Sequence, residues 1–214
     1  TPRLPSGARI PMTIRNLEFL FRPKSIAVVA DADPKNAEES SRYAEIVLRN
    51  LAAGGFVGPV LRVTATTRSL FGIGAHVHID ALEIVPELAV ICVPLKDVAK
   101  IVAQLGASGT RAVIVGSSIH ENMKDSEIAL ARKAILDAAR PNLVRVLGPG
   151  SGGLVVPGSA LNASVSPVNA IPGRIAMIAQ SAAVAAAVLD RANSRGIGFS
   201  SVIHLGSAVD IDLA

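Results

Sequence analysis

Aromatic residues are scarce in this sequence. Phe, Trp and Tyr together make up 3% of its 214 residues, with no tryptophan and a single tyrosine. This scarcity argues against a platform of rings on which the bases of single-stranded nucleic acid stack. The only cysteine, Cys92, lies in the apolar run "LAVICVP" and has no second cysteine with which to form an internal disulfide. The cysteine count therefore favours a reducing, cytoplasmic setting.

Long apolar runs and runs of like charge are also missing. No stretch approaches the roughly 20 apolar residues that a membrane span requires, and no signal peptide is visible. The formal net charge of +4 is carried by scattered basic residues. We therefore expect neither a membrane nor a nucleic acid as a partner, whereas a phosphate-rich small molecule suits the slight basic excess. Half of the residues are apolar, mostly small and aliphatic, as in closely packed α/β layers.

Apolar segments of two kinds alternate along the chain. Strands are expected at 25–30, 59–65, 87–94, 111–118 and 143–148, and helices at 41–53, 95–106 and 123–139. Strands that alternate with helices predict right-handed βαβ units and a parallel sheet.

Proline and glycine divide this pattern into domains. Residues 1–15 form an N-terminal arm, 16–148 the first domain, and 149–172, with four prolines and four glycines, a linker. A second unit, 173–214, contains a strand at 174–180, a helix at 181–196 and a strand at 199–207. A β-α-β unit this small leaves a sheet edge and the helix face of Val184, Val188 and Leu189 short of partners. We expect residues beyond 214, or another chain, to cover them.

The stretch "KSIAVVADADPKN" (24–36) begins like a nucleotide site but lacks its glycines. A buried strand leads into Ala30-Asp31-Ala32, and the first glycine after it is Gly54. A dinucleotide-binding turn needs Gly-x-Gly-x-x-Gly at this place, so an NAD(P)-dependent oxidoreductase is a poor interpretation.

A series of segments in a fixed order resembles the NDP-forming acyl-CoA synthetases, relatives of the succinyl-CoA synthetase α subunit. These segments are "FLFRPKSIAVV", "VLRNLAAGGFVGPV", "ELAVICVP", "RVLGPGSGGLVVP", "LNASVSP", "PGRIAMIAQS" and "RGIGFSSVIHLGSAVDID". The resemblance implies an α/β fold: a Rossmann-like CoA-binding domain, then the start of a flavodoxin-like, succinyl-CoA synthetase-type ligase domain.

The resemblance also implies a reaction. In the family, acyl-CoA, phosphate and NDP give acid, CoA and NTP through an acyl phosphate and a phosphohistidine. Our alignment places that histidine beyond residue 214, so this chain alone is expected to be inactive and to work with an ATP-grasp domain or subunit elsewhere. The alternative is a non-catalytic, ligand-sensing module fused to a GNAT-type protein acetyltransferase. Homo-oligomer formation is left open.

Several positions that face CoA in the family carry other residues here. Gly-Ala-Ser after the first strand reads Ala30-Asp31-Ala32, and the next turn, Gly-Ser-Val-Gly, reads Ser41-Arg42-Tyr43-Ala44. Asn-Pro-Lys reads Thr64-Ala65-Thr66, with Arg68 as a partial substitute for the lysine. "LGPNCLGL" reads "LGPGSGGL", and "SQSG" reads Ala179-Gln180-Ser181-Ala182. A CoA or acyl-CoA site is therefore expected, but one that binds weakly.

The candidate residues form two groups, and none is expected to be catalytic or to bind a metal. The predicted CoA-binding residues are Ala30, Asp31, Ala32, Arg42, Thr64, Thr66, Arg68, Val93, Pro94, Ser117, Ser118, Gly150 and Ser151. Gln180, Ser181 and Ala182, at the start of a helix, are the predicted phosphate-binding residues. His76 and His78 lack a third metal ligand, and His204 is expected to be a satisfied, partly buried histidine rather than a nucleophile.

Overall fold

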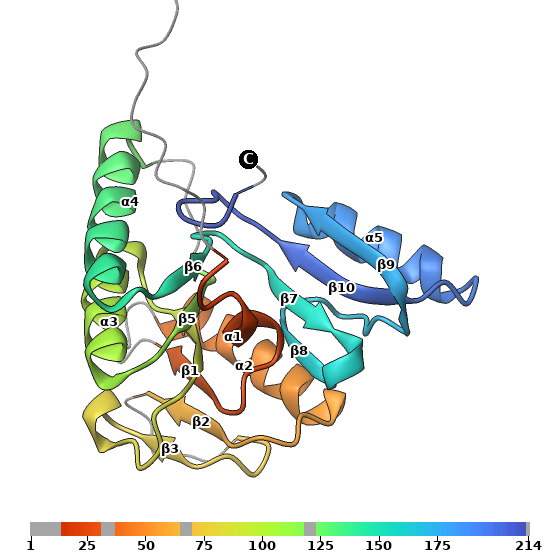
Figure 1. The fold of residues 1–214 in the computed structure, drawn as a ribbon, viewed down its shortest axis with the longest axis horizontal. Helices are drawn as coiled ribbons and strands as arrows, with labels where there is room; N and C mark the ends of the chain where they lie inside the picture. The colour runs from red at the N-terminus through yellow and green to blue at the C-terminus, as the bar shows by residue number, and fades with distance from the viewer. Residues whose placement is uncertain (1–13, 31–36, 65–69, 118–122, 213–214) are drawn as a thin grey trace, which may run out of the picture.

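Two β-sheets with flanking helices make up the molecule (Figure 1). The structure is a computed structural model that describes residues 14–30, 37–64, 70–117 and 123–212. The helices are α1 (Glu18–Phe21), α2 (Ala37–Gly54), α3 (Leu95–Ser108), α4 (Asp125–Ala139) and α5 (Ala182–Asn193). The strands are β1 (Ile26–Ala30), β2 (Val60–Val63), β3 (Ala75–His76), β4 (Leu88–Cys92), β5 (Ala112–Val115), β6 (Arg145–Leu147), β7 (Gly153–Val156), β8 (Leu161–Ser164), β9 (Pro172–Ala179) and β10 (Phe199–His204).

The first sheet is parallel throughout, with strand order β3-β2-β1-β4-β5-β6. This is the doubly wound order of the Rossmann fold. The predicted α/β fold is thus confirmed, and the five strands and three helices expected over 25–148 all form with shifted ends. The sequence pattern did not predict the two-residue edge strand β3.

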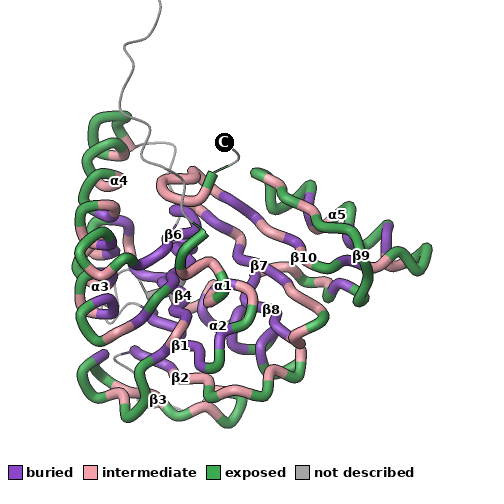
Figure 2. The backbone as a smooth tube through the Cα atoms, in the orientation of Figure 1, coloured by how far each residue is buried: buried purple, intermediate pink, exposed green. Residues whose placement is uncertain are grey.

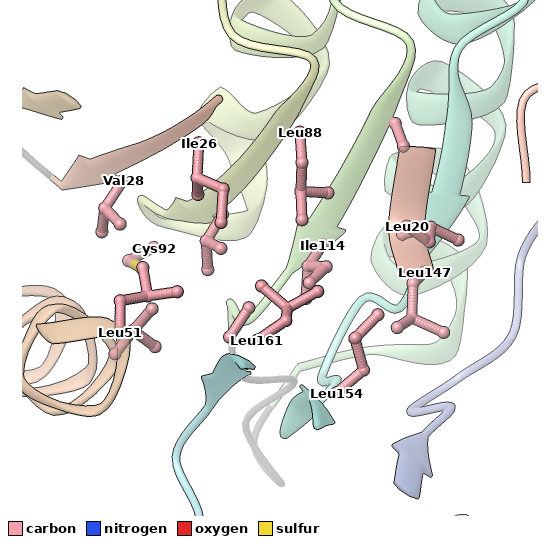
Figure 3. Close-up of a cluster of buried hydrophobic side chains, with 14 of the residues drawn as sticks. Leu20, Ile26, Val28, Leu51, Leu88, Cys92, Ile114, Leu147, Leu154 and Leu161 are labelled. Atoms are coloured by element: carbon pink, nitrogen blue, oxygen red, sulfur yellow. The ribbon is translucent and has the colours of Figure 1, made fainter. Parts of the chain in front are cut away.

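Both faces of the first sheet are covered because successive side chains of a strand point to opposite faces. Ile26 and Val28 of β1 pack in the cluster on the α2 face, and Ala27 and Val29 pack in the cluster on the α3 and α4 face. Figure 2 shows β1, β4 and β6 of the first sheet as buried, with its β2 and β3 side more exposed, and Figure 3 shows the α2-face cluster at close range. Continuous apolar strands such as "IAVVA" are the sequence signature of this two-sided burial.

Residues 149–172, expected to be a linker, contain the antiparallel pair β7 and β8. β7 also pairs with β10, so the second sheet has the order β8-β7-β10-β9. Leu154 and Leu161 of this pair are each 1% exposed and belong to the core of the first sheet (Figure 3). Asn50 of α2 donates to the Ser164 and Ser166 carbonyl oxygens at 2.8 and 2.9 Å. The segment is therefore a packed part of both layers rather than a connection alone.

After β10 the chain returns to the first sheet. The amides of Ser207, Val209 and Ile211 donate to the carbonyl oxygens of Pro149, Gly148 and Val146, at 2.8, 3.2 and 3.4 Å. An ion pair secures this return: Arg145 Nε lies 2.8 Å from Asp210 Oδ2, which also accepts from the Val146 amide. The segment 205–212 thus runs antiparallel to the chain around β6.

The second sheet ends at an exposed edge formed by β9. Ile175 and Ile178 of β9 are each 50% exposed, and Val184 and Val188 of α5 are 58% and 41% exposed. Leu189 of α5, which we grouped with these valines, is instead 1% exposed and packs against Val155 and Val202 of the second sheet. In the part of the chain that is described, no helix is long and apolar enough to cross a membrane.

We predict that the exposed residues of β9 and α5 are covered, either by residues beyond 214 or by another chain. Ile178 follows Met177, which packs under α5, so Ile178 lies on the opposite face of the second sheet. If chains of residues 1–214 associate through that face, Ile178→Lys should weaken their association, because the ammonium group cannot be buried there without a partner. Leu130→Lys is the matched control, since Leu130 is 69% exposed on α4, which lies far from β9 and α5 (Figure 1). Solution scattering and hydrogen exchange check the prediction. A compact monomer in which residues 172–204 are strongly protected would contradict it.

Candidate functional site

The strand order reverses between β1 and β4, and in open α/β sheets this is where ligands bind, beyond the carboxyl ends of the strands. Ala30 and Cys92, the last residues of the two strands, are register partners there. Val93 follows β4 and is 6% exposed, and Pro94 occupies the N-cap position of α3, where its side chain makes no capping hydrogen bond. The first amides of α3 therefore lie at this edge, and the side chain of Pro94 gives them no acceptor. Uncapped amides at the start of a helix are typical of anion-binding sites.

A cavity of about 490 Å³ lies where the carboxyl ends of both sheets meet. From the first sheet it is lined by Tyr43 of α2 and by Gly116, which follows β5. From the second it is lined by residues that follow β9 and β10. Among the described residues, its lining is Tyr43, Gly116, Pro149, Gly150, Ser151, Gly152, Val165, Gln180, Ala182, His204, Gly206 and Ser207.

A smaller cavity of about 230 Å³ lies on the second-sheet side of the first one and is largely apolar. The two cavities share four lining residues: Gly152, Val165, Ala182 and His204. Ala186 and Leu189 of α5 and Val202 of β10 supply much of the remaining apolar wall. The larger cavity is thus bounded by the Tyr43 ring at one end and by this apolar space at the other.

Tyr43 crosses the carboxyl ends of the first sheet. Its hydroxyl donates to the Ser151 carbonyl oxygen at 2.6 Å. A methyl group added at Gly116 would lie 2.6 Å from Tyr43 Cε1, so the ring rests directly on the Gly116 backbone. Burial raises the pKa of the Tyr43 phenol well above its ordinary value, and the nearby Cys92 thiol contributes in the same direction. Tyr43 is therefore a neutral, fixed wall of the cavity at physiological pH.

His204 holds the other side of the cavity. Its Nδ1 accepts a hydrogen bond from the Gly152 amide, and the ring also bonds the Gln180 backbone. Desolvation lowers the pKa of His204, with the Gln180 bond acting in the opposite direction. The imidazole is thus neutral and engaged on both sides, as expected for a structural histidine. The His204 carbonyl oxygen accepts from the Ser151 hydroxyl, which in turn accepts from the Gly153 amide at 3.0 Å.

Of the predicted site residues that the structure describes, four meet in the larger cavity: Gly150, Ser151, Gln180 and Ala182. Ser117 lies beside them, since its carbonyl oxygen accepts from the Gly150 amide at 3.0 Å. The Ser117 hydroxyl, however, donates to the Val93 carbonyl oxygen and is buried, so it ties two strand ends together. Ser151 is 1% exposed and internally bonded, so only its backbone is placed to face a ligand.

The remaining predicted residues are spread along the same edge. Thr64 follows β2 and is 4% exposed, while Arg42 is exposed on α2 next to Tyr43. Ser181 caps α5, its hydroxyl accepting from the Val184 amide at 3.3 Å. Asp31, Ala32, Thr66, Arg68 and Ser118 lie outside the described residues. His76 and His78 lie at and just after β3, and no group of metal-ligating side chains occurs among residues the structure describes.

Sequence reasoning missed Tyr43 and Gly116. Tyr43 had been aligned with a valine of the family pattern, but the flanking positions drew attention only as lost glycines. Gly116 ends the run "RAVIVG" and gave no signal of its own, because the ring that requires it is more than seventy residues away in the chain. The sole tyrosine in a chain so poor in aromatic residues was the available clue.

Sequence comparisons place these two layers in known families. Residues 24–157 match the model described as "CoA binding domain", and residues 172–214 match "Succinyl-CoA ligase like flavodoxin domain". The chain belongs to the CoA-binding domain family, with a succinyl-CoA ligase-like segment after it. A CoA-binding domain implies CoA as its ligand.

Curated relatives are ADP-forming ligases. The chain is 31% identical over 203 residues to the α subunit of acetate–CoA ligase [ADP-forming] I of Pyrococcus furiosus, covering 92% of this chain and 42% of that protein. It is 27% identical over 190 residues to the 4-hydroxybutyrate–CoA ligase [ADP-forming] of Nitrosopumilus maritimus, covering 88% and 26%. The chain thus spans less than half of the length of these relatives.

Among solved structures, the dinucleotide-forming acetyl-coenzyme A synthetase 1 of Ca. Korarchaeum cryptofilum, in complex with phosphate and ADP, is similar with a TM-score of 0.79 and 30% identity. The match covers 92% of this chain and 40% of that one. A Pyrococcus horikoshii OT3 protein gives the same TM-score at 28% identity, covering 92% and 44%. The chain is therefore similar to the CoA-binding portion of such synthetases.

We predict that Gly116 and Tyr43 are energetically coupled. Gly116→Ala should destabilise the protein by about 1–3 kcal/mol, because the new methyl group overlaps the Tyr43 ring. In the double variant with Tyr43→Val the overlap is relieved, so its loss of stability should be smaller than the sum of the two single losses. Denaturant unfolding measures all four proteins. Gly74→Ala is the control, since nothing lies within 4 Å of its added methyl group. Additive losses would contradict the coupling.

The phenol of Tyr43 should titrate well above the ordinary tyrosine pKa of 10.0. Because the chain has one tyrosine and no tryptophan, phenolate absorbance reports this residue alone. The folded pKa is raised, so the stability linked to Tyr43 is fully present below about pH 10 and is lost as the pH rises through the folded pKa. A spectrophotometric titration of the folded protein, compared with the protein in denaturant, checks this. Identical midpoints in the two titrations would show that the phenol is not buried.

Proposed function

We propose that this chain binds CoA or acyl-CoA as the CoA-binding portion of an NDP-forming acyl-CoA synthetase, and that it binds this ligand weakly. The whole reaction, acyl-CoA plus phosphate and NDP giving acid, CoA and NTP, would require parts that this chain does not supply by itself. An ATP-grasp domain or subunit is the expected partner. The single observation that carries the proposal is the cavity of about 490 Å³ between the carboxyl ends of the two sheets.

The position of this cavity suits the reactive end of a long ligand. A nucleotide at the switch point between β1 and β4 would place its phosphates beside the start of α3, whose amides favour negative charge. The chain of the ligand would then run toward Gly116 and Gly150, so that its reactive end lies in the cavity that these residues line. At the far side, Gln180, Ser181 and Ala182 are exposed at the start of α5, where a phosphate group could accept hydrogen bonds from backbone amides.

The proposed weakness comes from charge. Asp31 and Asp33 follow β1, where the family pattern has small residues and a polyanion is expected, and Thr66 stands where the family has a lysine. At ~5 Å and an effective dielectric constant of ~20, each carboxylate opposes a phosphate charge by about 3 kcal/mol before salt screening. A charge-assisted hydrogen bond to phosphate is worth about 1.5–3 kcal/mol, so losing the lysine alone lowers affinity roughly 10- to 100-fold.

The test is to restore the missing charge. Thr66→Lys combined with Asp31→Ala should tighten CoA binding about tenfold at low salt, and the gain should shrink as salt rises. Ser108→Lys with Glu83→Gln is the matched control: it adds the same net charge at the opposite edge of the first sheet, where both residues are exposed. Calorimetric titration of CoA at two salt concentrations measures each protein.

The outcomes separate the parts of the proposal. Equal gains in both double variants would mean that the effect is general attraction rather than a repaired contact. Sub-micromolar binding by the unaltered chain would mean that it uses other contacts and that the site is not weakened. No binding by any variant would contradict CoA binding itself and would favour the sensing module as the explanation of the fold.

A further inference from the structure

We propose that Tyr43 sets the size of the group that the ligand can carry on its sulfur, by filling the space beside Gly116 with its ring. This inference rests on the proposed function, since it concerns the acyl end of a CoA thioester in the same cavity. It assigns to Tyr43 a specificity-determining role that comes from its place in this fold. The family pattern has the smaller valine at the aligned position.

The first argument is the location of the ring. Tyr43 belongs to α2, but its hydroxyl reaches the Ser151 carbonyl oxygen, 108 residues away in the chain, at 2.6 Å. Between these points the ring passes over Gly116 at the end of β5 and near Cys92 at the end of β4. The ring therefore spans the strand ends over which a ligand entering from the switch point must pass to reach the cavity.

The second argument is that the ring cannot easily move aside. Its hydroxyl is held by the Ser151 carbonyl oxygen, and the glycine beneath it leaves no room between ring and backbone. The Ser151 side chain is fixed in turn by the His204 carbonyl oxygen and the Gly153 amide. An aromatic ring that is fixed both by its helix and by its hydroxyl bond excludes a bulky group more effectively than a mobile side chain does.

The third argument concerns the size and chemistry of what is excluded. Replacing tyrosine by valine would remove a phenol ring and leave a hole of matching shape above Gly116. A flat aromatic acyl group fits such a hole, whereas acetyl is small enough to be accepted with the ring in place. One methylene changes the discrimination between two ligands in an apolar pocket by roughly 10- to 200-fold. Removing a whole ring should therefore change the discrimination between the two acyl groups by an easily measurable factor.

The experiment measures the Kd of benzoyl-CoA and divides it by the Kd of acetyl-CoA for the same protein. In this ratio the general strength of CoA binding cancels. The unaltered chain should bind benzoyl-CoA the more weakly of the two. In Tyr43→Val this ratio should fall by at least about tenfold. Tyr43→Ala is a second opened variant in case valine disturbs α2. Tyr43→Phe is the matched control: it keeps the ring against Gly116 and loses the hydroxyl bond, so its ratio should stay nearer to that of the unaltered chain than to that of the opened variants.

A second pair of variants tests the competing location for the acyl group. Ala186→Leu fills the smaller, apolar cavity, and Ala187→Leu makes the same change at an exposed position one residue along α5. With the acyl group beside Gly116, neither change should move the ratio. Circular dichroism and thermal unfolding confirm that each variant is folded before it is titrated.

The results distinguish the role of Tyr43 from the binding of CoA itself. A lower ratio in both opened variants, with a clearly smaller change in Tyr43→Phe, supports the role of Tyr43. If all proteins bind CoA but the ratio is unchanged in the opened variants, or changes only in Ala186→Leu, the role of Tyr43 is overturned while CoA binding stands. If neither CoA nor either thioester binds to any of the proteins, the proposed function fails, and this inference fails with it.

Discussion

The turn from Gly148 to Gly153 is the constraint on which the rest of the structure depends. It leads from the last strand of the first sheet to the first strand of the second, and it lines the cavity between them. Gly153 has a φ of +90°, and a methyl group there would lie 2.6 Å from Ser164 Cα. Only glycine combines that backbone conformation with so close an approach to β8. Around it, the Ser151 carbonyl oxygen receives Tyr43 and the Gly152 amide binds His204, so both sheets are fixed to this one turn.

The sequence was most informative where one interaction dominates. Runs such as "IAVVA" and "LAVICVP" are buried on both faces, and such burial leaves a nearly unbroken apolar signal. The α/β class, the parallel direction of the strands and the helices around the first sheet therefore followed from the pattern. Strands that form only because of partners distant in the sequence could not be predicted from the pattern. "GLVV" and "LNAS" form β7 and β8 because β10 and α2 offer them partners, and four prolines and four glycines in 149–172 obscured both strands.

The candidate site shows the same division. Gly150, Ser151, Gln180 and Ala182 were found by resemblance and do meet in one cavity. A linear pattern could not show that the Ser117 and Ser151 hydroxyls are consumed by neighbouring carbonyl oxygens, because those bonds join different strands. Tyr43 was overlooked for a related reason. A family pattern draws attention to residues that have been lost, whereas the effect of a larger residue depends on what lies across the cavity from it.

The return of the chain after β10 has a mechanical consequence. The second sheet leaves the first at Gly148–Pro149 and comes back at Ser207–Ile211, and these two segments are hydrogen-bonded side by side. A body attached by one strand can swivel freely about single bonds, but one attached by two paired strands cannot. Rotation of the second sheet about one connection alone would break the hydrogen bonds to the other, and the Arg145–Asp210 ion pair opposes the same movement. Because Leu154 and Leu161 are also buried in the core of the first sheet, the start of α5 keeps a fixed direction relative to the carboxyl ends of that sheet.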